Sequence, residues 1–199
     1  MKEKFLILIA GLLIILSTTA SSCRQSILYE NENANAASVN TTSNNGTYSV
    51  IGQPTINANF IDQLLCNYGS PARGTGDDLY SGEVQYNIDP TFALAFFWHE
   101  SNFGTKGEAR YSKSLGNLRC IDEELSCTDG YAWFASWQDG YTQWYRLISG
   151  GLYIGCGRTT INTIIPRYAP AADNNNEYAY ISNLKQLIDW WRAGNNSIP

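Results

Sequence analysis

The chain has 199 residues, among them 13 Lys and Arg, 18 Asp and Glu and one histidine, and it carries a formal net charge of −5 at pH 7. This acidic, lysine-poor composition argues against nucleic-acid binding, which needs a basic surface. The six Trp and thirteen Tyr suit carbohydrate binding, because such rings stack on the apolar faces of sugars while offering a polar edge, although most of them must serve packing.

The N-terminal segment predicts export. Lys2 and Lys4 precede an apolar run from Phe5 to Leu16, a pattern typical of a signal peptide over residues 1–22 and too short for a comfortable transmembrane helix. Cys23 follows Thr19-Ala20-Ser21-Ser22, which resembles a bacterial lipoprotein box and implies a lipid on Cys23. Ordinary cleavage near Ala20 to Ser22, leaving a free Cys23 thiol, is the alternative. Either way the protein is expected outside the cytoplasm, anchored to the membrane or secreted to the cell wall.

Two further segments follow the signal peptide. Residues 23–53 are rich in Asn, Ser, Thr and Ala and read as a flexible tether, lipid-anchored if Cys23 is modified. Apolar periodicity begins at Pro54, and residues 54–199 have the length of one compact domain.

Within this domain the pattern predicts a mainly α fold with a small β-hairpin or irregular lobe. A helix over Asn57–Asn67 precedes a Gly-, Ser- and Asp-rich connection over Tyr68–Tyr86. The next helix begins at Pro90 after an Asp89 cap. The hairpin or loop falls within residues 111–134. The remaining predicted helices are Trp137–Leu147, Thr159–Tyr168, which stops near Pro166, and Asn175–Arg192.

Glu100 is the most informative single residue. It shares one helical face with Phe92, Ala93, Phe96 and Phe97. A carboxyl held against apolar surface at a helix C-terminus resists ionisation, so its pKa should rise toward the range of a general acid. Gly104 would then let the chain turn away from the cleft. The alternative is an ordinary solvated glutamate at a helix end.

The five cysteines are an odd number. Lipidation of Cys23 leaves an even set of four in an exported protein, and we predict disulfides Cys120–Cys127 and Cys66–Cys156, although four cysteines allow three pairings. A zinc site is disfavoured, because no CxxC pair occurs and His99 is the only histidine. No metal and no cofactor is expected.

Several short segments, taken in order, resemble a known family. They are Ile88-Asp89-Pro90, Glu100-Ser101 with Phe103-Gly104-Thr105, Gly116-Asn117-Leu118-Arg119-Cys120, Phe134 to Gly140, and Tyr168-Ala169-Pro170 with Asp173-Asn174-Asn175 before Tyr178-Ala179-Tyr180-Ile181. The chain from about Asn57 to Trp191 resembles the bacterial endo-β-N-acetylglucosaminidases of glycoside hydrolase family 73, which have a lysozyme-like fold. The resemblance implies hydrolysis of β-1,4 bonds between the aminosugars of peptidoglycan.

The resemblance also implies roles for individual residues. Glu100 would be the general acid, and Asp139 stands where the family usually has a second acid, a glutamate. Asn117 belongs to a blurred Asn-Leu-x-Gly segment, and Tyr168 with Tyr178 or Tyr180 would orient an N-acetylated sugar. The loop acids Asp122, Glu123, Glu124 and Asp129 are other candidates for the second carboxylate. Alternatively, the substrate's own N-acetyl group takes the place of a second acid, in which case Glu100 suffices.

The aromatic residues near these segments leave two interpretations open. Trp98, Trp133 and Trp137 are candidate stacking platforms for sugars, or packing residues. His99 is expected in the cleft wall or the core, because adjacent helical residues point about 100° apart. The protein is expected to act as a monomer.

Two other functions fit the sequence. A lytic transglycosylase shares the fold and the Glu-Ser pair, but its Gly-Leu-Met-Gln type segment is missing after Glu100. A glycan-binding lipoprotein without activity would explain the weakened Asn-Leu segment and the Asp at position 139.

Overall fold

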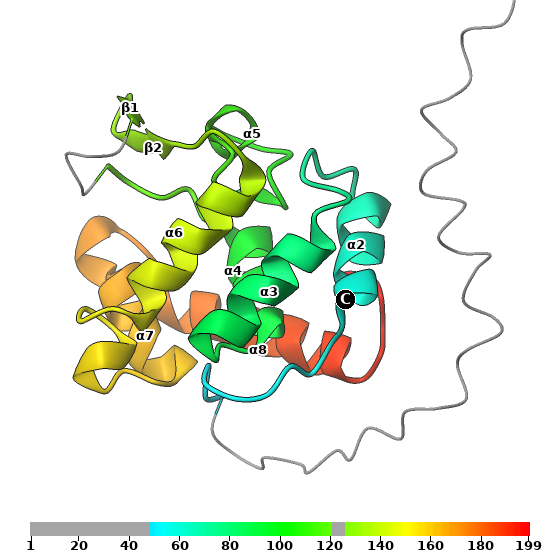
Figure 1. Ribbon diagram of the computed structural model, residues 1–199. Helices are drawn as coiled ribbons and strands as arrows, with labels where there is room; N and C mark the ends of the chain where they lie inside the picture. The colour runs from blue at the N-terminus through cyan, green and yellow to red at the C-terminus, as the bar shows by residue number, and fades with distance from the viewer. Residues whose placement is uncertain (1–47, 121–125) are drawn as a thin grey trace, which may run out of the picture. The chain divides into compact units, whose positions relative to one another are not determined.

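The computed structural model describes residues 48–120 and 126–199. The predicted signal peptide, Cys23 and the loop acids Asp122, Glu123 and Glu124 lie outside the described residues. Within them the fold is mainly helical with one two-stranded antiparallel sheet (Figure 1), as expected from the sequence. None of the helices in these two ranges is long and apolar enough to cross a membrane.

The central helix α4 (Pro90–Ser101) forms the middle of the core. Its residues from Pro90 to Phe97 are all buried, which is the pattern of a helix surrounded by protein rather than one with a single apolar face. Asp89 caps its start by accepting a hydrogen bond from the Thr91 amide, as predicted. The helix ends at Asn102, which takes the left-handed conformation with φ of 49°.

The helix α3 (Gly76–Tyr86) corrects the prediction of a connection over Tyr68–Tyr86. It lies between α2 (Ala58–Asn67) and α6 (Trp137–Ser149). A side chain at Gly76 would come within 2.3 Å of the Ala58 carbonyl oxygen, and one at Gly82 within 2.5 Å of the Tyr145 ring. The glycines that suggested a loop instead allow close packing of this helix against its neighbours.

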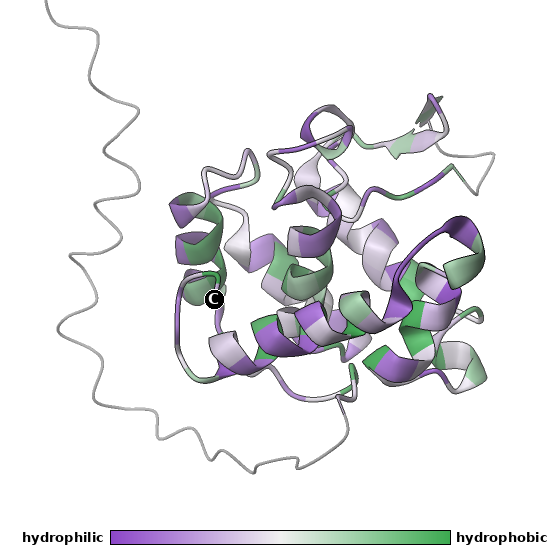
Figure 2. Ribbon diagram, turned by 180° about the vertical axis from the view of Figure 1, so that it is seen from behind, coloured by the Kyte–Doolittle hydropathy of each residue, from purple (hydrophilic) through white to green (hydrophobic). Residues whose placement is uncertain are grey.

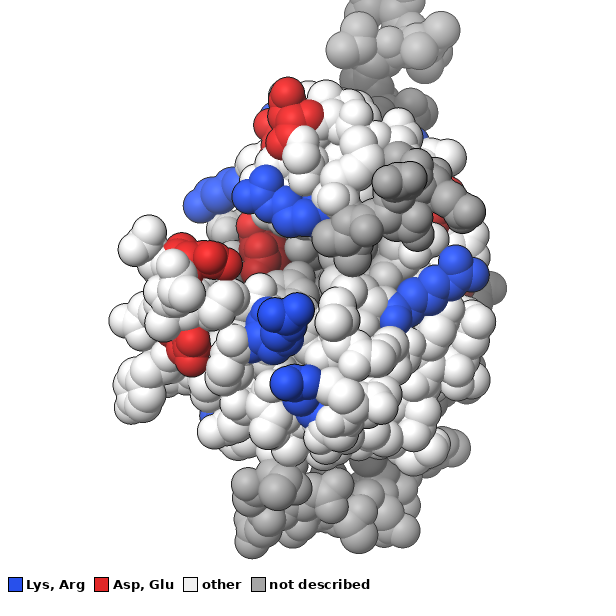
Figure 3. All heavy atoms as spheres, turned by 90° about the vertical axis from the view of Figure 1, so that its left-hand side faces the viewer, with Lys and Arg blue, Asp and Glu red and all other residues white. Residues whose placement is uncertain are grey.

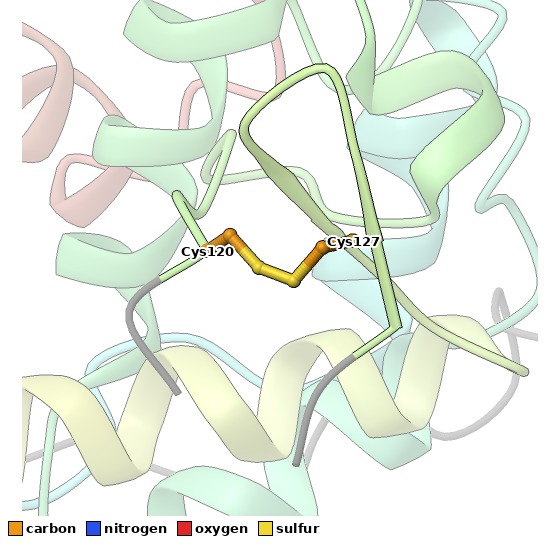
Figure 4. The surroundings of a disulfide bond; sticks show 2 residues. All are labelled: Cys120 and Cys127. Carbon is orange, nitrogen blue, oxygen red and sulfur yellow. A yellow bond between two sulfur atoms is a disulfide. The ribbon is translucent and has the colours of Figure 1, made fainter. Parts of the chain in front are cut away.

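A short excursion follows α4 and contains α5 (Ala109–Ser112) and a hairpin of β1 (Ser126–Thr128) and β2 (Tyr131–Trp133). Cys127 pairs with Ala132 across the hairpin. Figure 4 shows the disulfide between Cys120 and Cys127, whose Cα atoms are 5.9 Å apart. The hairpin and this local disulfide were both predicted.

The other predicted disulfide, Cys66–Cys156, is wrong. Cys156 is a free, exposed cysteine in a 3₁₀ turn, η1 (Ile154–Cys156). Its Sγ atom contacts the Arg158 guanidinium and the Tyr153 carbonyl oxygen, 3.3 Å away. The segment after α6 therefore folds back on itself and holds the thiol locally.

The C-terminal helices complete the fold. They are α7 (Ile161–Tyr168), a 3₁₀ turn η2 (Ala171–Asp173) and α8 (Glu177–Arg192). Pro166 lies inside the last turn of α7 rather than ending it. The helix α8 packs along α4 and α7, and Figure 2 shows hydrophilic and hydrophobic stripes on the helices that surround the core.

The tether predicted as far as Gln53 ends earlier. Val50 is buried, its amide donates to the Thr159 carbonyl oxygen at 2.8 Å, and its own carbonyl accepts from the Asp89 amide at 3.0 Å. Ser49 and Ile51 form isolated bridges with Thr160 and Ile88. This short extended segment is hydrogen-bonded on one side to the residues before α7 and on the other to the residues before α4. Residues 48–53 therefore belong to the domain.

Candidate active site

A cleft of about 1100 Å³ lies at the C-terminal end of α4. Its lining comes from the last turn of α4, residues 116–119, one side of α6, and the region from the end of α7 to the first turn of α8. Figure 3 shows the face of the molecule on the side of β1, α6 and α7, where basic side chains lie on both sides of a hollow that contains acidic side-chain atoms.

Glu100 lines this cleft from the last turn of α4. The Tyr180 hydroxyl donates a hydrogen bond of 2.5 Å to its Oε1 atom. Burial raises the pKa of Glu100 above its ordinary value, and the Tyr180 hydrogen bond and the nearby Arg119 guanidinium offset only part of this rise. The protonated carboxyl that a general acid needs is therefore favoured by the position of the side chain.

The turn that carries Glu100 is fixed by its neighbours. The buried Ser101 hydroxyl donates to the Leu115 carbonyl oxygen at 2.7 Å and accepts from the Gly104 amide at 2.8 Å. The Asn117 side-chain amide donates to the Glu100 backbone oxygen at 2.7 Å. The Ser101 and Asn117 side chains therefore hold the backbone of the turn that carries Glu100.

Two tyrosines stand beside Glu100 in the cleft. Tyr168 donates to the Gly116 carbonyl oxygen at 3.2 Å, and both Tyr168 and Tyr180 pack against the ring of Phe96. Burial, with a smaller contribution from the Glu100 charge, raises the pKa of both phenols well above their usual range. Both hydroxyls are consequently kept as hydrogen-bond donors.

His99 forms part of the cleft wall. Its ring stacks on Tyr180 with the centroids 3.6 Å apart and 18° between the planes. Burial of part of the ring lowers the pKa of His99, which favours the neutral imidazole on the face of Tyr180, the tyrosine that hydrogen-bonds Glu100.

Gly116 explains how residues 116–119 reach the cleft. A Cβ atom at Gly116 would lie 2.6 Å from Trp144 Cδ1, so only glycine lets the backbone cross the buried indole. Asn117 then takes a positive φ of 48°, a conformation that asparagine tolerates better than most residues.

Asp139 does not line the cleft with Glu100, so the structure gives no support to its predicted catalytic role. It is the third residue of α6, and its Oδ2 atom accepts from the Ser136 amide at 3.1 Å and from the Ser136 hydroxyl at 2.7 Å. The Asp139 amide in turn donates to the Ser136 hydroxyl at 3.1 Å, and these reciprocal bonds form a capping box that stabilises the start of α6. Asp139 is not among the residues that line the cleft.

Several predicted sugar-binding residues also lie elsewhere. Tyr178 is 83% exposed and outside the cleft. Trp98 packs on Tyr68 and Phe103 and lines a separate cavity of about 300 Å³. Trp133 in β2 and Trp137 at the start of α6 do not line the cleft either. Of the predicted aromatic residues, Tyr168 and Tyr180 are brought together with Glu100.

The cleft contains residues that the sequence patterns did not single out. Arg119 and Arg146 line it, and Asp173 is the other carboxylate besides Glu100 among the described lining residues. Arg146 faces the cleft through its register on α6, which the sequence alone does not distinguish from a solvent-facing position. Residues 48–120 and 126–199 contain no group of three or more His, Cys, Asp or Glu able to hold a metal ion.

Comparison with known proteins gives no further assignment. The sequence matches no protein-family model and no curated protein.

Proposed function

We propose that the protein is a glycoside hydrolase that cleaves β-1,4 bonds between N-acetylglucosamine and N-acetylmuramic acid in peptidoglycan, and that its domain has a lysozyme-like fold. The observation that carries the proposal is the half-buried carboxyl of Glu100 in a large cleft. Burial raises the pKa of this carboxyl, and the Tyr180 hydroxyl donates a hydrogen bond of 2.5 Å to its Oε1 atom. A neutral carboxyl in that position is suited to protonate a glycosidic oxygen.

The size and lining of the cleft favour a polymeric sugar substrate. Its volume of about 1100 Å³ exceeds the volume of about 300–1,000 Å³ that is usual for a pocket that binds one small ligand. The lining combines tyrosine rings with amide groups such as Asn117, Gln143 and Asn175. Amides and phenols suit the hydroxyl and N-acetyl groups of aminosugars, which both donate and accept hydrogen bonds.

The mechanism that follows needs one protein acid. Glu100 donates its proton to the leaving oxygen as the glycosidic bond breaks. With Asp139 engaged at the start of α6, the oxocarbenium-like centre is supported by the substrate's N-acetyl carbonyl oxygen. The second N–H of the Asn117 amide orients that oxygen, and Tyr168 holds the neighbouring Gly116 through its hydroxyl. Water then attacks at the sugar carbon, and the Glu100 carboxylate takes up its proton.

The proposed location follows from the N-terminal pattern. A signal peptide over residues 1–22 and a lipid on Cys23 would hold the domain at the outer side of the membrane, next to the cell wall. The partners are then peptidoglycan strands and, through the lipid, the membrane, with the domain acting as a monomer.

The test is turnover of purified cell walls by the wild-type protein and by Glu100→Gln. Loss of a general acid should lower the rate by about 10²–10⁴-fold while circular dichroism stays unchanged. The matched control is Glu108→Gln, at the start of α5 and outside the cleft, which should keep the wild-type rate. A Glu100→Gln rate within about tenfold of wild type would remove Glu100 as the acid.

A lytic transglycosylase is the second candidate, favoured by the position of Asp139 away from the cleft, because that reaction also uses one acid. Product analysis separates the two functions. Hydrolysis releases reducing ends and consumes water, whereas a transglycosylase leaves 1,6-anhydro-muramic ends. Binding of cell walls with no release of either product would indicate a glycan-binding protein without activity.

A further inference from the structure

Two arginines line the cleft from different elements. Arg119 belongs to the segment before β1, and Arg146 belongs to α6. The protein as a whole is acidic, with a net charge of −5. Both side chains are exposed to solvent at the cleft, so an anionic ligand that enters the cleft can reach their positive charge.

Both guanidinium groups are held in place by aromatic residues. Arg119 lies with Cζ 4.1 Å from the centroid of the Tyr131 ring, and these two residues also form a backbone bridge. Arg146 donates from Nε to the Tyr86 hydroxyl at 3.3 Å. Stacking and a single bond at Nε fix the direction of a guanidinium and leave its outer nitrogens available for an anion.

Neither arginine is paired with an acid in the part of the chain that the structure describes. The ion pair found there joins Arg192 to Asp89, away from the cleft. Among the described residues, the carboxyls that share the cleft lining are Glu100 and Asp173. Burial raises the pKa of Glu100 and so favours its neutral form, which leaves more positive than negative charge on the described part of the lining.

We propose that Arg119 and Arg146 bind carboxylate groups on the glycan, so that the cleft selects anionic aminosugar chains over neutral ones. This inference rests on the proposed glycosidase function and adds the substrate feature that the cleft recognises. Guanidinium groups bind carboxylates through paired, charge-assisted hydrogen bonds. In peptidoglycan such carboxylates occur on the peptide stems and, on muramic acid residues that carry no stem, on the free lactyl group.

The experiment uses one glycan in two charge states. Hydrolysis of the amide between each lactyl group and its peptide yields strands with free lactyl carboxylates, and methyl esterification neutralises these without changing the sugars. Wild-type protein should cleave the charged strands at least about tenfold more efficiently in kcat/KM than the ester, as expected for a charge-assisted hydrogen bond. Arg146→Gln and Arg119→Gln should each lower this ratio, and the double variant should bring it close to one.

The matched control is Arg110→Gln. Arg110 is an exposed arginine in α5 whose Cζ lies 5.9 Å from the ring centroid of Tyr111, outside the cleft. Its replacement removes the same charge and should leave the ratio unchanged. Arg119 also lowers the pKa of Glu100, so each ratio is taken at the optimum pH of that variant.

The outcomes separate the two proposals. A wild-type preference below about twofold on both peptide-free and peptide-bearing strands, or one that the double variant keeps, overturns carboxylate recognition while the hydrolase proposal stands. A preference that appears only with strands that still carry peptides supports it and assigns the carboxylates to the stems. If no strand is cleaved, calorimetry decides instead: tighter binding of the charged strand, lost in the double variant, supports the arginine site, and equal binding of both strands overturns it.

Discussion

The ionisation of Glu100 depends on a hydrogen bond that another helix supplies. Tyr180 belongs to α8, 80 residues further along the chain, and its hydroxyl lowers the pKa of Glu100 against the larger effect of burial. A general acid acts in its protonated form, so activity falls as the pH rises through the pKa of this carboxyl.

Replacing Tyr180 with Phe should move that fall in activity to higher pH. The variant removes a hydrogen bond that stabilises the carboxylate, so the pKa of Glu100 rises and the acid stays protonated over a wider range. The measurement is kcat/KM against pH for wild type and Tyr180→Phe. Tyr178→Phe, on the same helix but exposed, is the control and should follow the wild-type curve. A downward movement in Tyr180→Phe would show that the hydroxyl acts other than by stabilising the carboxylate.

The acid at position 139 shows how one short pattern supports two interpretations. Resemblance to a family placed a catalytic carboxylate there, but a Ser followed three residues later by an acid at a helix start is also the sequence signature of a capping box. The structure has the capping box. The Ser136-to-Asp139 spacing was visible in the sequence. Asp139 forms the cap because the amides at the start of a helix need hydrogen-bond acceptors.

We therefore expect Asp139→Ala to affect stability and to spare chemistry. Loss of the reciprocal bonds with Ser136 should lower the free energy of unfolding by about 1 kcal/mol. Activity below the melting temperature should stay close to wild type, whereas loss of a catalytic acid or base costs about 10²–10⁴-fold. Urea denaturation and cell-wall turnover of the same preparation check both parts. A large loss of turnover with unchanged stability would restore Asp139 to the active site.

Local sequence patterns predicted the helices that have clear caps or apolar faces. They failed for features that depend on contacts between distant segments. The Asp89-Pro90 start and the stripe of α8 are visible in the sequence, because capping and periodicity are local properties. The helix α3 was missed because the glycines that weaken it in isolation permit its close packing. The tryptophans were assigned to the cleft because a ring in a wall and a ring in a core have the same local pattern.

At the level of the whole domain, one buried carboxylate joins three distant segments. The Asp89 side chain accepts from Arg192 Nη2 at 2.7 Å and from the Thr55 hydroxyl at 2.8 Å, and it also caps α4 through the Thr91 amide at 3.2 Å. Its side chain is 2% exposed and that of Arg192 is 30% exposed. The segment before α2 at Thr55, the start of α4 and the end of α8 therefore meet at this group.

Asp89→Ala should destabilise the whole domain. The expected loss is about 3 kcal/mol, near the low end for breaking a buried pair, because Arg192 keeps access to water. Chemical denaturation measures it, with Asp77→Ala, an exposed acid in the first turn of α3, as the control that should lose less than about 1 kcal/mol. Equal losses in the two variants would show that Asp89 acts only as a helix cap.

The ring of Phe96 touches Trp144 in the core and both cleft tyrosines, with centroid distances of 5.4 Å to Trp144, 5.0 Å to Tyr168 and 6.0 Å to Tyr180. No layer of loops separates the substrate surface from the interior. Substitutions meant to alter specificity at Tyr168 or Tyr180 will therefore also change core packing, and their effects will not add to those of core mutations. An engineering library for this protein should vary Phe96 together with the two tyrosines, since single-site searches would discard combinations that are tolerated only jointly.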